Sequence, residues 1–332
     1  MSTKRWIAVI AAVSLFLVSS AFTMFTTIFS TSFDDLFTAS EAPFEERVVE
    51  KGDGTDKIAV LHLNGIIENT YSPPGIFQSA GYNHENFLKQ LDFAAKDADV
   101  HGIIIRVNTP GGGVVESSEI HDSIVDIQEE FSKPVYISMG SMAASGGYYI
   151  AAPATKVYAN SQTITGSIGV IMQSINVSEL ADELGISSEV IKSGPYKDIM
   201  SMTREMTDDE RNILQEMIDE SYEQFVDVIE AGRDFTRDEV YELADGRIYS
   251  GKQAYEANLI DGLGHFHEVI DAMQEDLDRG NMNVVEYEPN FGFSGLFSFA
   301  AKRMFTNELD LLGISDWLQT NQGQKMMYLY TN

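Results

Sequence analysis

Short apolar runs separated by polar and turn-forming residues predict buried strands that alternate with helices. Residues 58–63 (Ile-Ala-Val-Leu-His-Leu), 100–108 and 134–138 are apolar at most positions, as expected for short buried strands. Residues 83–97 and 115–131 lie between these runs, and the first of them carries apolar side chains at helical spacing. The pattern predicts an α/β fold.

The second half of the chain continues the alternation. Residues 154–159 predict a strand, residues 175–184 a helix and residues 188–192 a further strand. Capping boxes at 207–210 and 236–239 predict two helix starts, the first of a long helix. Apolar side chains form a stripe on that helix, which indicates core or a subunit interface: Ile213, Met217, Ile218, Tyr222, Phe225 and Ile229.

Residues 6–29 contain no charged side chain and predict a membrane-spanning helix. As a helix these 24 residues would span about 36 Å, more than the roughly 30 Å of a hydrocarbon core. Lys4 and Arg5 precede the segment and acidic residues follow it, so residues 1–5 are expected in the cytoplasm and the rest outside. The alternative is a signal peptide cleaved at the small residues 19–21. The apolar run continues beyond that site, which favours a retained anchor.

The chain after this segment divides into three parts by composition. Residues 30–56 are polar and acidic and predict a linker. Residues 57–285 contain the predicted strands and helices of the folded domain. Residues 286–332 predict an aromatic C-terminal extension. Its last five residues, 328–332 (Tyr-Leu-Tyr-Thr-Asn), are extended and mostly apolar, and we hypothesise that they enter a substrate groove as a mimic or are trimmed.

The chain is strongly acidic, with 51 Asp and Glu against 22 Lys and Arg and a net charge of −29. Such a surface repels phosphate backbones, so no nucleic-acid partner is expected. The chain has no cysteine, which excludes disulfides, thiolate metal sites and a cysteine nucleophile. The six histidines show no metal-binding spacing. We therefore expect neither a metal nor a cofactor.

Ser145 lies in a run of small residues that follows a predicted strand: 142–147 reads Met-Ala-Ala-Ser-Gly-Gly. Small neighbours would leave its hydroxyl exposed at a strand-to-helix turn, as in a nucleophile elbow, although alanine precedes the serine where that motif has glycine. Gly146 would leave its backbone N–H free to face the group under attack. The alternative is a tight junction in which small residues serve only packing.

A second glycine-rich segment, 109–113 (Thr-Pro-Gly-Gly-Gly), lies between a predicted strand and a predicted helix. A phosphate-binding loop is disfavoured, because neither GK[ST] nor the GxGxxG spacing is present. A plain turn remains, as does a loop whose glycine N–H faces an oxyanion. The latter needs a nucleophile elsewhere, for which Ser145 is the candidate.

A serine nucleophile needs a base, and the sequence around Ser145 offers no histidine. A buried lysine can serve, because burial favours the neutral amine. The lysines nearest along the chain are Lys156, Lys192 and Lys197. Lys197 has small and apolar neighbours, but Asp198 beside it would favour the charged form unless Arg204 held that carboxylate. The residues alone leave this choice open.

Five short segments, in a fixed order along the chain, carry a likeness to a known family. They are Asn108–Gly113, Met139–Tyr149, Thr165–Val170, Ser193–Asp198 and Asp245–Gly251. Together they resemble signal peptide peptidase SppA, a family of membrane-anchored serine proteases of bacteria and archaea. The resemblance covers about residues 56–270 and matches the short form of the family. It implies a ClpP/crotonase-like α/β core of repeated ββα units, preceded by one transmembrane helix.

The resemblance also implies roles for individual residues. Ser145 would be the nucleophile, Lys197 the general base and Ser167 the hydroxyl that orients the lysine amine. The backbone N–H groups of Gly111 and Gly146 would form the oxyanion hole. Three apolar side chains near these segments are predicted to line a substrate pocket: Val114, Met142 and Tyr148.

The implied activity is that of a serine endopeptidase that degrades remnant signal peptides and other extended peptides at the outer face of the cytoplasmic membrane. The resemblance further implies a homo-oligomeric ring in which Ser145 and Lys197 of one site come from different chains. A general envelope quality-control protease is an alternative that the sequence does not separate. The predicted export anchor disfavours a crotonase-type CoA enzyme, and the Ser145/Lys197 pair disfavours a non-catalytic membrane scaffold.

Overall fold

The computed structural model of the chain describes residues 5, 13–16, 18–19, 43–69, 82–289 and 326–330. The chain divides into two compact units, and the sheet with its helices belongs almost entirely to the unit formed by Glu46–Tyr287 and Gly313–Asn332. No helix among the described residues is long and apolar enough to cross a membrane. The predicted anchor, residues 6–29, lies largely outside the described residues.

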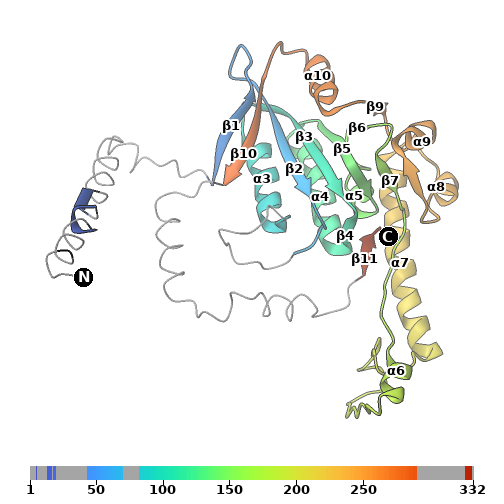
Figure 1. Cartoon of the computed structure of the whole chain (residues 1–332). Helices are drawn as coiled ribbons and strands as arrows, with labels where there is room; N and C mark the ends of the chain where they lie inside the picture. Colours follow the sequence, from blue (N-terminus) through green and yellow to red (C-terminus); the bar gives the residue numbers. More distant parts are fainter. Residues whose placement is uncertain are drawn as a thin grey trace. The chain divides into compact units, whose positions relative to one another are not determined.

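Strands and helices alternate along most of the described chain (Figure 1). The strands are β1 (Phe44–Glu50), β2 (Lys57–Asn64), β3 (Val100–Thr109), β4 (Gly111–Gly113), β5 (Val135–Ala144), β6 (Lys156–Ala159), β7 (Ile164–Gly166), β8 (Ile248–Ser250), β9 (Gly262–Leu263), β10 (Asn283–Pro289) and β11 (Met327–Leu329). The helices are α3 (His84–Lys96), α4 (Val114–Glu130), α5 (Gly146–Tyr149), α6 (Ser178–Glu183), α7 (Asp208–Gly232), α8 (Arg237–Leu243), α9 (Gly251–Glu256) and α10 (Phe266–Leu277).

Among the described residues, the main sheet has nine strands, of which seven follow the order β1-β10-β2-β3-β5-β6-β9. Its central strands are parallel, with Val60 opposite Ile104 and Ile105 opposite Ile137. β7 lies beside the carboxyl end of β5 and pairs with it in parallel, and β8 pairs with β7 in the antiparallel direction. Parallel strands covered on both faces are apolar at nearly every position, which is why their runs were readable in the sequence. The α/β prediction is confirmed.

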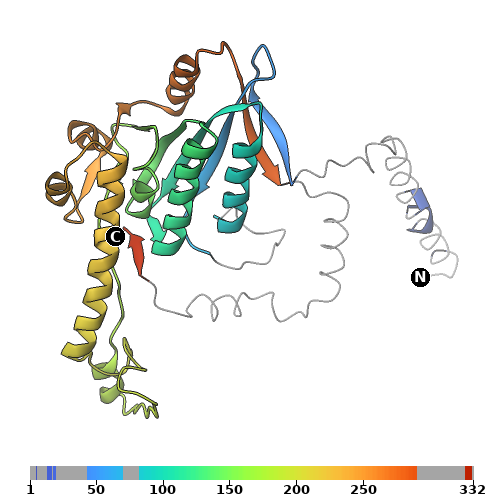
Figure 2. The same cartoon turned by 180° about the vertical axis from the view of Figure 1, so that it is seen from behind.

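Helices cover both faces of the central strands. On one face, Ile58, Val60, Ile104 and Tyr136 pack in a cluster with apolar residues of α10. The alternate strand positions, such as Leu61 and its β3 neighbour Ile105, face the other way. On that face α3 and α4 lie in front of the strands in Figure 2. Because every central strand is buried on both sides, the carboxyl ends of β3 and β5 are held rigidly, and the glycine-rich and serine segments follow from these ends.

Two local predictions fail for physical reasons. Residues 44–50, within the predicted linker, form strand β1, whose side chains are exposed after the first position. Charged residues suit an edge strand, so hydrophobic patterning alone misses it. Residues 188–192 form no strand. Their apolar side chains are exposed, Ile191 fully so, and a strand needs a neighbouring strand to satisfy its backbone. By contrast, both predicted capping boxes are present, at the starts of α7 and α8.

Candidate active site

Ser145 is the single residue between β5 and α5, and its backbone is strained. Its φ of 53° and ψ of −115° lie outside the regions that non-glycine residues favour. The Ser145 N–H donates to the Gly166 carbonyl at 2.7 Å, and its own carbonyl accepts the N–H groups of Tyr148 and Tyr149. These bonds fix the turn from both sides. The predicted sharp strand-to-helix turn is confirmed, and it has the geometry of a nucleophile elbow. The expected exposure of the Ser145 hydroxyl is wrong, because the residue is only 1 % exposed.

The glycine triplet beside this turn is the short strand β4, not a loop. The Gly113 N–H donates to the Ile67 carbonyl at 2.7 Å, and the Ile67 N–H donates to the Gly111 carbonyl at 2.9 Å. The Gly111 N–H donates to Oγ1 of the buried Thr109 at 3.0 Å. Neighbouring residues of a strand point their backbone groups to opposite sides. The N–H and carbonyl of Gly112 therefore face away from Ile67.

The C-terminal segment fills the side that Gly112 faces. β11 pairs antiparallel with β4, with Tyr328 opposite Gly112. The Tyr330 N–H donates to the Pro110 carbonyl at 2.8 Å. Hydrogen-bonded pairs recur every second residue in an antiparallel ladder, so Tyr328 and Gly112 form the next such pair. The tail is therefore paired with the glycine strand; that it occupies a substrate groove as a mimic, or is trimmed there, stays a hypothesis.

The other edge of β11 is also hydrogen-bonded. Met327 exchanges both backbone hydrogen bonds with Ile171, at 3.1 and 3.2 Å. The backbone of the tail is thus held as an extended strand between Ile171 and β4. This is the mode in which extended peptides add to the edge of a sheet.

The carbonyl of Tyr328 lies at the junction of β4 and the serine turn. A Cβ placed on Gly111, whose φ is +104°, would lie 2.0 Å from this oxygen. A Cβ placed on Gly146 would lie 3.2 Å from it and 3.1 Å from the Gly112 nitrogen. Two glycines are needed for the backbones to approach this closely. A peptide carbonyl is therefore positioned next to the amides of Gly112 and Gly146, directly beside Ser145.

The side chain of Tyr328 is fully buried in an aromatic pocket. Its ring stacks on Tyr149 with a centroid distance of 4.8 Å and lies 4.8 Å from the ring of Phe225. Burial raises the pKa of the Tyr328 hydroxyl. The prediction of Tyr148 as a pocket residue needs correction, because its ring is buried elsewhere and its hydroxyl donates to the Leu259 carbonyl at 2.8 Å. The adjacent Tyr149 takes that place.

Ser167 lies close to Ser145 through the same backbone connection. It follows Gly166, whose carbonyl accepts the Ser145 N–H. Ser167 has a φ of 52°, and its N–H donates to the Arg247 carbonyl at 2.8 Å. The residue is 9 % exposed. Val114 and Met142, the other predicted pocket residues, are half-buried.

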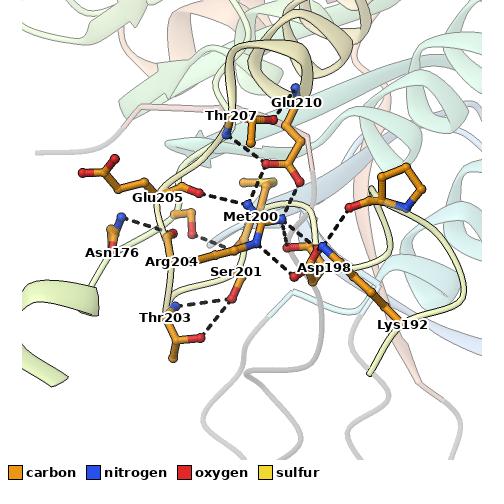
Figure 3. A network of polar contacts seen from close by, with 12 residues as sticks. Asn176, Lys192, Asp198, Met200, Ser201, Thr203, Arg204, Glu205, Thr207 and Glu210 are labelled. Atoms are coloured by element: carbon orange, nitrogen blue, oxygen red, sulfur yellow. Dashed lines mark hydrogen bonds and ion pairs between the residues drawn. The ribbon is translucent and has the colours of Figure 1, made fainter. Parts of the chain in front are cut away.

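Lys197 is exposed and lies in the segment that precedes α7. Figure 3 shows Arg204 between the carboxylates of Asp198 and Glu210 in this segment. Lys192 also pairs with Asp198, at 2.6 Å. The carboxylate of Asp198, next to Lys197 in the sequence, is therefore paired with Arg204 and Lys192. The sequence analysis made such pairing a condition for Lys197 to act as the base.

The same network sets the charge state of its acids. Hydrogen bonds from Arg204, and then from Lys192, hold the pKa of Asp198 well below its usual range. The Arg204 guanidinium, with the N–H of Thr207, lowers the pKa of Glu210 to about 2. Glu210 belongs to the first turn of α7, so the network fastens the Lys197 segment to that end of the helix.

Within one chain this end of α7 is distant from Ser145. Phe225, which contacts Tyr149 close to the serine turn, lies 15 residues after Glu210. At about 1.5 Å per residue these positions are roughly 22 Å apart along the helix. The structure thus brings Ser145, Gly146, Ser167 and the glycine strand together, and leaves Lys197 outside this group.

Comparisons with known proteins identify the family of the chain. Residues 128–279 match the model of peptidase family S49. A protein of Enterococcus faecium named as a signal peptide peptidase SppA is 37 % identical over 298 residues, which cover 87 % of this chain and 85 % of that protein. The chain belongs to peptidase family S49. It is a serine peptidase of the signal peptide peptidase type.

More distant members of the family show the same likeness over part of their length. Protease 4 of Salmonella typhi is 32 % identical over 213 residues, covering 64 % of this chain and 33 % of that protein. The chloroplastic serine protease SPPA of Arabidopsis thaliana is 30 % identical over 218 residues, covering 65 % of this chain and 32 % of that protein.

Sequence reasoning missed Gly112, Tyr149 and Phe225 as site residues. A signal for Gly112 was present, because alternation within a strand would have pointed its N–H opposite to those of its neighbours. The sequence analysis left a turn and an oxyanion-facing loop open for this triplet, and neither has the alternation of a strand. Phe225 belongs to the predicted apolar stripe of the long helix, but only the fold shows that it contacts Tyr149.

Proposed function

We propose that this chain is a membrane-anchored serine endopeptidase in which Ser145 and Lys197 form a catalytic dyad. The observation that carries the proposal is the peptide strand β11, paired with β4 so that its Tyr328 carbonyl lies beside the strained Ser145 turn. A substrate bound in the same way would offer its carbonyl carbon to the Ser145 hydroxyl. The likeness to SppA-type proteases supports the same conclusion.

The reaction follows from these positions. Ser145 Oγ attacks the substrate carbonyl carbon while the Lys197 amine takes the hydroxyl proton. The resulting ammonium gives a proton to the leaving amine nitrogen as the peptide C–N bond breaks, and water then hydrolyses the acyl-enzyme.

The oxyanion is stabilised by two backbone amides. Gly146 supplies one, as the sequence analysis predicted. For the other, the geometry favours Gly112 over the predicted Gly111, because the Gly111 N–H is already donated to Thr109. Each donor aimed at the developing charge contributes about 3–4 kcal/mol to lowering the barrier.

Lys197 reaches Ser145 from a neighbouring copy of the chain in this proposal. The support is its position at the far end of α7 together with the apolar side chains exposed around it. They are Ile175, Leu180, Leu184, Ile186, Val190, Ile191, Met202, Ile213 and Met217. Exposed apolar side chains concentrated in one part of the chain, residues 175–217, are typical of a protein interface. Packing against a second copy in a ring would cover it and bury the amine, which favours its neutral form.

Ser167 would orient the lysine amine once that neighbour is in place, since it already lies beside Ser145. The parallel sheet and its helices are compatible with the ClpP/crotonase-like core implied by the resemblance. Residues 6–29 would anchor the chain in the cytoplasmic membrane, with the catalytic part outside. There the substrates would be remnant signal peptides or, in the alternative, unfolded envelope proteins.

Peptidase activity of the purified full-length chain tests the dyad. Wild type, Ser145→Ala and Lys197→Ala are compared on a quenched fluorescent peptide, with size-exclusion chromatography to verify that each variant assembles like wild type. Both variants should lose turnover by several orders of magnitude while they keep the assembly. Activity retained in Lys197→Ala would identify another base, and activity retained in Ser145→Ala would remove Ser145 from the mechanism.

A further inference from the structure

We infer that the side-chain hydroxyl of Ser117 is a third donor to the oxyanion, in addition to the backbone amides of Gly112 and Gly146. The inference rests on the proposed function, in which the Tyr328 carbonyl marks the position of the attacked group. Ser117 belongs to the first turns of α4, the helix that directly follows the glycine strand β4 in the chain. Its hydroxyl is buried, has no bonding partner and is directed at the serine turn.

The Ser117 hydroxyl has no hydrogen-bond partner among the described residues, although the residue is fully buried. Serines inside helices often turn the hydroxyl back to the carbonyl four residues earlier. Ser123 of the same helix does so, donating to the Glu119 carbonyl at 2.8 Å. Ser221 of α7 does so as well, donating to the Met217 carbonyl at 3.0 Å. A buried hydroxyl that makes no such bond destabilises the fold, so its presence calls for an explanation.

The Ser117 hydroxyl points at Gly146, the residue after the proposed nucleophile. A Cβ placed on Gly146 would lie 2.7 Å from Ser117 Oγ. The same position is 3.1 Å from the Gly112 nitrogen and 3.2 Å from the Tyr328 carbonyl oxygen. The hydroxyl, the amide and the carbonyl oxygen therefore surround one point. Because Gly146 has no Cβ, that point holds no side chain that would separate the hydroxyl from the carbonyl oxygen.

The step that uses this hydroxyl is the formation of the tetrahedral intermediate. As Ser145 Oγ bonds to the substrate carbonyl carbon, the π electron pair of the C=O bond moves onto its oxygen. That oxygen then carries a negative charge and a further lone pair, so it accepts an additional hydrogen bond. Ser117 turns its hydroxyl to the oxygen by rotation about the Cα–Cβ bond and donates to it without losing its proton. When the C–N bond breaks, the carbonyl re-forms and the hydrogen bond is released.

A bond that forms only with the oxyanion accelerates the chemical step without tightening the binding of substrate. With the neutral Tyr328 carbonyl in place, the Ser117 hydroxyl bonds to none of the described residues, so the ground state gains nothing from it. Interactions that are stronger in the transition state raise kcat, whereas interactions of equal strength in both states lower KM. The contribution of Ser117 should therefore appear in kcat alone.

Ser117→Ala tests the assignment in the full-length, assembled enzyme with the quenched fluorescent peptide. We expect kcat to fall on the order of 100-fold, the effect of one lost oxyanion donor, while KM stays within about twofold of wild type. The urea midpoint should equal or exceed that of wild type, because the substitution removes an unpaired buried hydroxyl. Ser138→Ala is the matched control, since Ser138 is a similarly buried serine of β5 whose Oγ accepts a hydrogen bond from Arg106 at 2.8 Å. That control should lower the urea midpoint and leave kcat near the wild-type value.

A peptide aldehyde provides a second measurement that does not depend on turnover. Ser145 Oγ adds to the aldehyde carbon, and the hemiacetal oxygen then occupies the position of the oxyanion. In Ser117→Ala the Ki of the aldehyde should rise by about the factor by which kcat/KM falls. The Kd of the uncut peptide should be the same in Ser145→Ala and in the Ser145→Ala/Ser117→Ala double variant, because the neutral carbonyl makes no bond with Ser117.

The outcomes separate this inference from the proposed function. A wild-type kcat or an unchanged aldehyde Ki in Ser117→Ala would show that the serine serves only packing against Gly146, and would overturn the inference while the peptidase remains. A lowered urea midpoint in Ser117→Ala would overturn it as well, because the hydroxyl would then stabilise the fold. The proposed function itself fails if the assembled wild-type enzyme cleaves no peptide, or if Ser145→Ala cleaves as wild type does.

Discussion

Mixed assemblies provide a quantitative test of whether one active site is shared between two chains. Ser145→Ala chains keep Lys197, and Lys197→Ala chains keep Ser145. If both residues of a site belonged to one chain, no mixture of these two inactive variants could have activity. If the two residues come from neighbouring chains, a site is intact when the chain that supplies Ser145 is a Lys197→Ala variant and the chain that supplies Lys197 is a Ser145→Ala variant.

The expected activity follows from the geometry. The roughly 22 Å of α7 between Glu210 and Phe225 keep Lys197 from the Ser145 of its own chain. In a head-to-tail ring assembled at random from equal amounts of the two variants, about a quarter of the sites are intact. The mixture should therefore recover about 25 % of wild-type turnover.

The assay needs assemblies that contain both chains. The two variants carry different affinity tags, are co-expressed, and are purified through both tags in succession before peptidase activity is measured. Wild type mixed with the double variant is the matched control: about a quarter of its sites work if sites are shared, and about half if they are not. No activity in doubly purified Ser145→Ala/Lys197→Ala assemblies, together with half activity in the control, would refute the shared site.

Three further predictions address the glycine strand, the ion network and the tail. Thr109→Val should leave the buried Gly111 N–H without its acceptor, which lowers the free energy of unfolding by about 1–3 kcal/mol in urea denaturation and also reduces kcat; an unchanged kcat would show that this bond does not hold the oxyanion strand in place. Arg204→Ala should lower the urea midpoint at pH 7. Because Arg204 lowers the pKa of Glu210 to about 2, its contribution is present above the ordinary carboxyl pKa and is lost as the pH falls towards 2. The difference from wild type should therefore shrink below about pH 4, and a difference independent of pH would contradict this assignment. Intact-mass analysis should show a wild-type C-terminus ending at Tyr328 and a full-length C-terminus in Ser145→Ala; the same full-length mass in both would show that the tail binds without being cut.

The parts of the fold that were predictable are those set by local patterns. β2 and β3 were readable because both faces of these strands are buried, and α7 because its capping box marks its first turn. β1 was missed because an edge strand carries charged side chains. The prediction of a strand at residues 188–192 is wrong because local hydrophobicity cannot distinguish a buried strand from an exposed apolar segment.

The candidate site was only partly predictable for a similar reason. Ser145 and its neighbours are contiguous in sequence, and small residues there have a direct geometric meaning. The choice of Gly112 over Gly111 depends on strand alternation and on the bond to Thr109. The pocket joins Tyr149 to Phe225, 76 residues later, and no periodicity reveals a contact over that distance.

If substrates bind along the backbone of β4, as proposed, the folded state of a substrate is its main protection. A peptide can occupy this groove only if consecutive residues have free N–H and carbonyl groups, and folded proteins have few such stretches. A segment that opens at a cost of about 4 kcal/mol is exposed only about one-thousandth of the time. Such an enzyme would thus sort proteins by local stability, degrading at a rate set by how often a segment opens.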